Sequence, residues 1–300
     1  MAVLALLLLT GFLLNAGEDF SVLKGPYLGQ MPPGMTPEIF APGIVSTDAP
    51  EGSSGFVMGG TAFLFQRFVD RDCHTYITTR KGDPWSPPER IPFWKELIHN
   101  GDFVIAPDDH TLLYQVKQER AGRLESNIWE VRLNEDGWGP RSALPAPINT
   151  EYDESNASRA ANGNLYFFSN RPGGKGQFDL YMAECKHGGY PEPINLQELN
   201  TAHHEWDPFI APDESYLVFC STRPGGLGQD DLYISFRDRE GRWCEPVHLD
   251  DRFNSPRSEN RPYVPHDGRF LFFTSSREGN RDIYWVDARI IEEIKAGVLK

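Results

Sequence analysis

The chain has 300 residues, which exceeds the usual size of one domain but is common for a single all-β repeat fold. Its 28 glycines and 24 prolines favour short strands and tight turns over helices. A formal net charge of −14 repels phosphate groups and anionic lipid heads, so neither nucleic acid nor a membrane surface is expected as a partner.

The first predicted element is an apolar run over residues 3–14, followed by polar residues 17–19. The run has the length of the hydrophobic part of a signal peptide and is too short to cross a bilayer. We therefore expect a signal peptide over residues 1–16, an N-terminal arm over 17–36, and a periplasmic or secreted protein without membrane insertion after cleavage. A buried N-terminal strand is the alternative.

A repeat of about 52 residues occupies most of the remaining chain. Residues 163–181, 215–233 and 269–284 are near copies, and two more divergent copies precede them at 61–76 and 111–129. Each copy closes on an aromatic residue, at Tyr76, Trp129, Tyr181, Tyr233 and Tyr284. One period holds four short apolar runs separated by turns, as at 209–211, 216–220, 232–236 and 245–249. Four antiparallel strands in each repeat predict an all-β fold, a single β-propeller.

The two ends of the repeat region predict how the propeller closes. The last copy lacks a fourth strand, because residues 289–300 read as a short C-terminal helix. Residues 37–42 resemble the fourth strand of the third full copy, so we expect them to complete the last blade and cover its open edge. The propeller then spans residues 37–288 with five four-stranded blades, and six blades are the alternative.

The best-preserved motifs resemble a known family. Ser221-Thr222-Arg223 is followed by Asp231-Leu232-Tyr233, and the same pattern recurs at 275–277 and 282–284. These motifs are similar to the WD-like repeats of TolB-type propellers, and the similarity covers residues 40–290, most strongly from 149 onward. The resemblance implies a secreted or periplasmic bacterial propeller that makes protein contacts at the cell envelope.

A carboxylate recurs just before the first strand of four repeats, and the second repeat has Asn100 at this place. The four acids are Glu51, Glu154, Glu205 and Glu259. First strands line the channel of a propeller, so these groups are expected at one mouth of it. They could bind a substrate, a cation or a glycan, or act as acid and base in glycoside cleavage.

A structural role for these acids is favoured by the arginines that recur with them, namely Arg171, Arg223 and Arg277. The repeat with Asn100 has Gln118 instead of arginine, as expected if the acid and the arginine form a pair. The structural pairs are therefore expected to be Glu154–Arg171, Glu205–Arg223 and Glu259–Arg277. Glu51 has Val69 at the arginine position and Arg67 nearby, which leaves Glu51 freest to bind a ligand.

The clearest break in the repeat is at residues 202–207, where two histidines, a tryptophan and two acids crowd one loop. Histidine beside carboxylate can bind a metal or transfer protons, although solvated histidines at the rim are the favoured interpretation. The candidate ligand-binding residues are Glu51, Asn100, His203, His204 and Trp206. If the protein is an enzyme, the candidate catalytic residues are Glu51, Glu205 and Asp207.

No Cys-x-x-Cys pair or nucleophile motif occurs, and the four cysteines are expected mainly as thiols, with a disulfide permitted after export. We expect no metal and no cofactor, although a cation at the channel mouth remains open. The sequence favours a monomeric, non-catalytic platform that binds an envelope protein or a glycan. The alternative is a carbohydrate-active hydrolase or lyase.

Overall fold

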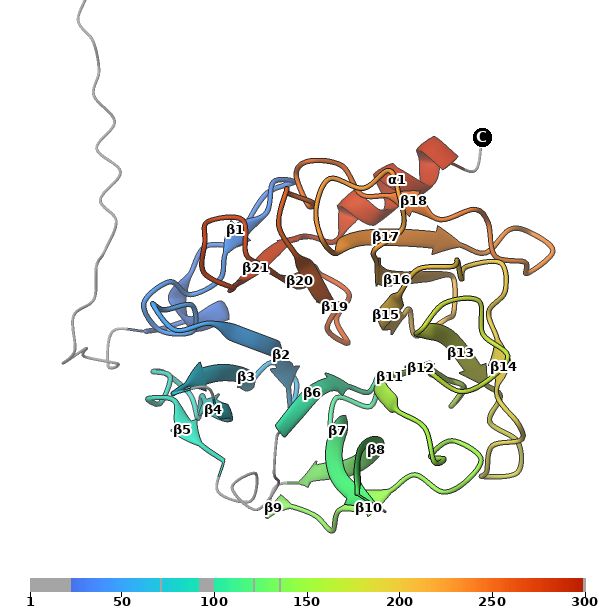
Figure 1. Ribbon diagram of the computed structural model, residues 1–300. Helices are drawn as coiled ribbons and strands as arrows, with labels where there is room; N and C mark the ends of the chain where they lie inside the picture. The colour runs from blue at the N-terminus through green and yellow to red at the C-terminus, as the bar shows by residue number, and fades with distance from the viewer. Residues whose placement is uncertain (1–22, 71, 92–99, 121, 135, 299–300) are drawn as a thin grey trace, which may run out of the picture.

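The structure is a computed structural model that describes residues 23–70, 72–91, 100–120, 122–134 and 136–298. The predicted signal peptide lies outside the described residues. Five antiparallel sheets surround a central axis, which confirms the predicted five-bladed propeller (Figure 1). The innermost strands of the five blades, in chain order, are β2 (Glu51–Val57), β6 (Asn100–Ile105), β11 (Glu154–Arg159), β15 (Glu205–Ile210) and β19 (Glu259–Tyr263).

The other strands follow outward from the axis in each blade. The second strands are β3 (Ala62–Val69), β7 (Thr111–Arg120), β12 (Leu165–Ser169), β16 (Tyr216–Ser221) and β20 (Phe270–Ser275). The third strands are β4 (Asp72–Thr79), β8 (Arg123–Asn134), β13 (Asp179–Ala183), β17 (Asp231–Phe236) and β21 (Asp282–Asp287). The outermost strands are β5 (Glu89–Arg90), β10 (Ser142–Ala143), β14 (Ile194–Asn195), β18 (Val247–His248) and β1 (Glu38–Ile39), and β9 (Gly137–Trp138) also pairs with β8.

The second and third strands are apolar because neighbouring blades cover both faces of each sheet. In β20 and β17 every residue is buried, so alternation of polar and apolar residues is absent there. The inner strands instead carry a bulge, where two residues oppose one on the next strand. Asn156, Asp207 and Arg261 occupy the bulges of three blades with positive φ angles of 46°, 51° and 55°. Equivalent bulge residues of different blades therefore lie close together near the central axis.

The last blade takes its outermost strand from the N-terminal part of the chain. In β1, Glu38 lies opposite Trp285 of β21, and Ile39 lies opposite Tyr284. The next residue, Phe40, is fully buried, and its ring centroid lies 4.7 Å from that of Phe63 in the first blade and 5.0 Å from that of Trp285. Aromatic packing of this kind joins the first blade to the last.

Two short helices complete the fold of the described residues. The 3-10 turn η2 (Tyr27–Gly29) packs its tyrosine against the same aromatic cluster. The predicted C-terminal helix is α1 (Arg289–Val298), whose Ile290 and Ile291 are buried in the core. Within the described residues, no helix has the length and apolarity that spanning a membrane requires.

Candidate functional site

The recurrent acids are buried parts of the framework. Glu205 has no exposed surface, and its carboxylate accepts hydrogen bonds from the Thr201 backbone N–H at 2.8 Å and hydroxyl at 2.7 Å. Ser221 donates a third hydrogen bond at 2.8 Å, and Arg223 forms an ion pair with Glu205 at 3.3 Å. Arg223 also donates to the Leu199 carbonyl, in the segment that joins two blades. The acid and the arginine therefore fasten the connection between blades.

The other two predicted pairs differ in detail. Arg171 forms a direct ion pair with Glu154 at 3.1 Å. Arg277 reaches Glu259 through Ser275, whose hydroxyl donates to the carboxylate at 2.6 Å and accepts from the arginine Nε at 3.0 Å. The predicted Glu259–Arg277 pair is therefore bridged by a serine, whereas Glu154 contacts its arginine directly.

Glu51 is not the free carboxylate that the sequence suggested. It has no exposed surface, and Arg67 lies directly opposite it on β3, with the arginine Nε 3.1 Å from the carboxylate. Thr47 donates a further hydrogen bond at 3.0 Å. Burial nevertheless raises the pKa of Glu51 to about 8, against the opposing effects of Thr47 and Arg67. Glu51 therefore belongs to the same framework as the other acids, and it lies away from the surface of the channel mouth.

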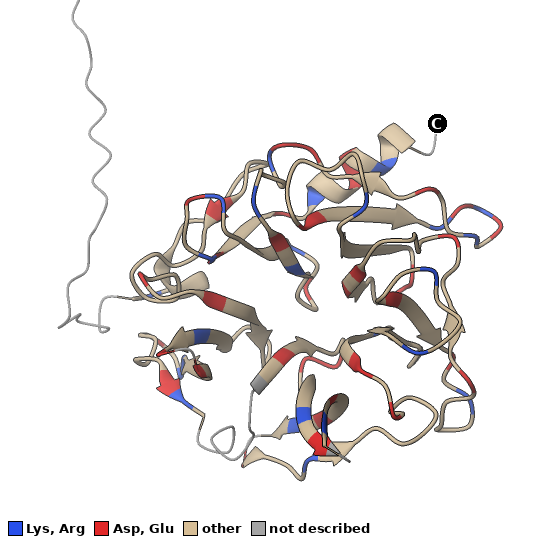
Figure 2. Cartoon of the chain, in the orientation of Figure 1, with Lys and Arg blue, Asp and Glu red and all other residues tan. Residues whose placement is uncertain are grey.

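A small polar cluster, which we call the axial cluster, occupies the centre of the propeller. It consists of Asp102, Asn156, Asp207 and Arg261, which come from four different inner strands. The Arg261 guanidinium is 2.7 Å from Asp102, and the Asn156 amide donates to Asp207. Figure 2 shows acidic residues on the inner strands around the axis. Burial and the nearby Asp102 charge raise the pKa of Asp207 to about 6, although Arg261 opposes the shift.

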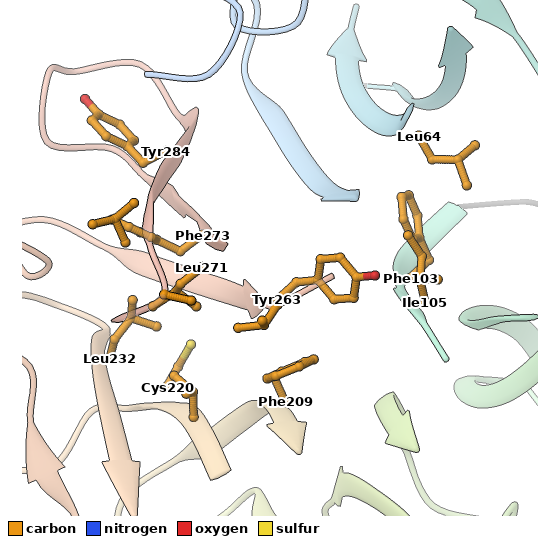
Figure 3. Close-up of a cluster of buried hydrophobic side chains, with 14 of the residues drawn as sticks. Leu64, Phe103, Ile105, Phe209, Cys220, Leu232, Tyr263, Leu271, Phe273 and Tyr284 are labelled. Carbon is orange, nitrogen blue, oxygen red and sulfur yellow. The ribbon is translucent and has the colours of Figure 1, made fainter. Parts of the chain in front are cut away.

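The space beside the axial cluster is small. The cavity beside the axial cluster holds about 10 Å³, roughly the room for one water molecule. Next to it, Tyr263 packs against Phe209 with ring centroids 5.6 Å apart, in an apolar cluster that also contains Phe103 and Ile105 (Figure 3). A Cβ atom added to Gly55 would lie 2.5 Å from the Tyr263 ring, so glycine permits this close packing. The axial cavity is therefore too small for a sugar ring.

A much larger space, which we call the interblade cavity, lies between the second, third and fourth blades. It holds about 290 Å³, near the lower end of the range for small-molecule sites. Its lining combines aromatic and polar side chains: Gln115, Lys117, Leu124, Ser126, Asp153, Ser155, Phe168, Phe178 and Trp206. The β7–β8 hairpin supplies one wall because it is longer than its equivalents, with pairing that extends to Arg120 opposite Arg123.

The candidate residues of the repeat break lie at different distances from this cavity. Trp206 lines it, and His204 stacks on Trp206 with ring centroids 5.3 Å apart. His203 is exposed. Asn100 begins β6 opposite Val116, and Asp207 belongs to the axial cluster. The break at 202–207 therefore contributes one cavity wall and one axial carboxylate, and Trp206 is the predicted ligand-binding residue that the cavity contains.

Three of the residues that line the cavity were not predicted from the sequence: Lys117, Phe168 and Phe178. Each occupies an ordinary strand position or loop end within its own repeat. Phe178 corresponds to Asp230 in the fourth blade, so comparison of the copies could have identified it as a second break in the repeat. Comparison of the copies does not predict that Phe178 and Trp206 line the same cavity, because the two residues belong to different blades.

The structure contains no site assembled for a metal among the described residues: no group of three or more His, Cys, Asp or Glu side chains is arranged to hold an ion. No disulfide joins the four cysteines, all of which lie in the described part of the chain. The cavity lining is suited instead to a ligand held by aromatic contacts and hydrogen bonds.

No protein-family model matches this sequence, and no curated protein matches it. Similar solved structures include a TolB candidate from Agrobacterium tumefaciens, with 15% identity, 81% of this chain and 76% of that chain covered, and a TM-score of 0.49. A BT0996 complex with RGII has 11% identity, covers 80% of this chain and 88% of that one, and has a TM-score of 0.53. An alpha-L-arabinofuranosidase from Lactobacillus brevis has 11% identity, covers 77% and 87%, and has a TM-score of 0.51.

At identities of 11–15%, these similarities extend to the fold alone. The five antiparallel sheets of the structure agree with the five copies of the sequence repeat. The five-bladed β-propeller predicted from the sequence is therefore confirmed as the fold.

Proposed function

We infer that the protein is a non-catalytic binding propeller that takes a glycan unit into the interblade cavity. The observation that carries this inference is the composition of the cavity, in which Trp206, Phe168 and Phe178 lie beside hydrogen-bonding side chains. Sugar rings have apolar C–H faces and polar edges, so they bind where aromatic faces and hydrogen-bonding groups lie together. The cavity, with a volume of about 290 Å³, accommodates one sugar ring, whereas the surface of a folded protein partner would not enter it.

Binding is favoured over hydrolysis by the state of the acids. Glycoside cleavage uses two carboxyl groups that face the bond being broken. Glu51 and Glu205 have no exposed surface, and both are engaged by threonine hydroxyls and arginines. Asp207 faces a cavity of about 10 Å³, in which no sugar ring fits. The acids named for the enzymatic alternative thus lack access to a substrate.

We also propose that the protein acts outside the cytoplasm, at the cell envelope. The support comes from the apolar run at residues 3–14 and from the TolB-like repeat motifs of the sequence. Glycans and glycan-bearing proteins are abundant ligands in that setting, which agrees with the chemistry of the interblade cavity.

A glycan array probed with the purified protein tests the proposed function. Trp206→Ala is expected to weaken binding of any array ligand at least tenfold, because it removes an aromatic wall of the cavity. Ile194→Ala is the matched control, since Ile194 is an exposed apolar residue (58% exposed) on the outermost strand of the third blade. Thermal melting of both variants identifies any loss that comes from unfolding.

Hydrolysis is tested on the same ligands by measuring the release of reducing ends. The proposal predicts binding without turnover. Turnover that disappears in Glu51→Gln or Asp207→Asn would contradict it and favour the enzyme. Binding that is unaffected by Trp206→Ala would also contradict it, because the ligand would then occupy another surface.

A further inference from the structure

The two charged residues that line the interblade cavity, Asp153 and Lys117, differ in how far the protein already engages them. Its acidic residue, Asp153, already accepts hydrogen bonds at both carboxylate oxygens. Oδ2 is 3.1 Å from Arg123 and 2.9 Å from the Asn170 amide, and Oδ1 accepts the Ser126 backbone N–H at 2.9 Å. The lone pairs that Asp153 offers a ligand are therefore largely used within the protein.

The cationic residue of the cavity is in the opposite situation. Lys117 lies on β7 opposite Ser126, beside the wall formed by the 48% exposed Leu124. Among the described residues, Lys117 forms no ion pair and no side-chain hydrogen bond, although the chain as a whole carries a net charge of −14. Its ammonium group therefore remains available to a ligand that enters the cavity.

The neutral polar groups add further donors. The Gln115 amide donates to the Ser126 hydroxyl at 2.8 Å and to the Ser155 hydroxyl at 2.5 Å. Each hydroxyl thereby uses a lone pair as acceptor and keeps its own O–H proton to donate. With the Lys117 ammonium, the cavity offers a positive charge and two hydroxyl donors. A carboxylate, which accepts hydrogen bonds and carries negative charge, is the complementary group.

The aromatic residues determine what else the ligand must carry. Phe178 and Trp206 lie with ring centroids 6.5 Å apart, and Phe168 and Phe178 meet edge to face at 5.4 Å. These side chains form an apolar wall next to the donor groups, and the volume of about 290 Å³ accommodates one ring. A small inorganic anion would leave this wall without a partner.

We propose that the interblade cavity recognises an acidic sugar unit, a hexuronic acid, whose carboxylate binds Lys117 and the two serine hydroxyls while its ring packs on Trp206. This inference rests on the proposed function, since it specifies which glycan the cavity selects.

The test is calorimetric titration of the full chain with two oligosaccharides of equal length, an oligogalacturonide and the corresponding neutral galactose oligomer. The wild type is expected to bind the acidic ligand at least tenfold more tightly. Lys117→Met keeps the length of the aliphatic stem and is expected to abolish this preference, because binding of the acidic ligand weakens at least tenfold. Lys186→Met is the matched control, because Lys186 is an exposed lysine paired with Glu184 outside the cavity.

The outcomes separate the two levels of the proposal. An acidic preference that persists in Lys117→Met overturns this inference, while loss of binding in Trp206→Ala still supports glycan recognition. Tight binding of the neutral oligomer alone also overturns the inference and leaves the proposed function intact. If a poly-aspartate peptide binds the wild type and neither sugar does, both the inference and the glycan function are overturned.

Discussion

Removing the cation from one buried pair tests whether the recurrent acids hold the blades together. Arg223→Ala deletes a guanidinium whose side chain is 11% exposed and removes the ion-pair partner of the fully buried Glu205. Hydrogen bonds to Glu205 from Thr201 and Ser221 remain. The substitution also removes the bond to the Leu199 carbonyl and the contact of the guanidinium with the Tyr233 ring at 4.8 Å.

The magnitude follows from these contacts. Leaving one member of a buried ion pair without its partner costs about 3–5 kcal/mol. The three remaining hydrogen bonds stabilise the Glu205 carboxylate and reduce this cost, so we expect the free energy of unfolding to fall by about 2–4 kcal/mol. The double variant with Glu205→Gln is expected to recover part of the loss, because no charge then remains buried at the site.

Urea denaturation followed by tryptophan fluorescence measures these differences. Arg242→Ala is the control, since Arg242 has a 73% exposed side chain and pairs with Asp238 at the surface. Its effect is expected to stay below about 0.5 kcal/mol. If Arg223→Ala unfolds at the same urea concentration as the wild type, the pair contributes nothing to stability and the structural interpretation of the acids is refuted.

Three further predictions concern the axis, the closure and the export of the chain. Burial raises the pKa of Asp207 to about 6, so the folded state loses stability as the pH rises from about 4 through 6. Asp207→Asn is expected to be more stable than the wild type by about 1–2 kcal/mol at pH 8, because Asp207 is only half-buried, and equally stable at pH 4. Urea titrations in which this stability difference does not depend on pH would refute the prediction. A chain that begins at residue 46 lacks β1 and the buried Phe40, and is expected to lose at least about 3–5 kcal/mol or to aggregate, whereas a chain that begins at residue 21 melts like the full chain. Mass spectrometry of the protein from its native cells is expected to find an N-terminus near Gly17, and retention of Met1 would refute export.

The fold could be predicted from the sequence because each blade repeats its strongest local signals. The Asp-Leu-Tyr motif at 231–233 forms part of β17, and its tyrosine lies beneath Arg223 as Tyr181 lies beneath Arg171. An arginine also lies over the equivalent tyrosine in the first and last blades. Because the same contact recurs in four blades, similar residues recur at a regular interval in the sequence. The short strands and their order can be predicted from that interval.

The role of Glu51 could not be predicted in this way. In the third and fourth blades a serine lies opposite the glutamate and the arginine follows two residues later. In the first blade Arg67 itself lies opposite Glu51, so a comparison by position finds Val69 and suggests a free acid. The long arginine side chain reaches the glutamate and the carbonyls of the preceding linker from both positions, as Arg67 does in the first blade and Arg223 in the fourth.

The interblade cavity was beyond sequence analysis for a different reason. Lys117, Phe178 and Trp206 belong to three different blades, and no local pattern connects them. Their proximity depends on how blades pack and on the length of the β7–β8 hairpin. Trp206 was identified because it interrupts a repeat, and that principle extends to Phe178.

The most direct test of ligand recognition in the interblade cavity is a titration followed by ¹H–¹⁵N spectra of the tryptophan indoles. The chain has seven tryptophans, and a Trp206→Phe variant assigns the signal of Trp206. We predict that an acidic oligosaccharide shifts the Trp206 indole signal in a saturable manner. The signal of Trp285, which is fully buried in the last blade and does not line the cavity, is expected to stay unchanged. A saturable ligand that leaves the Trp206 signal in place would contradict it.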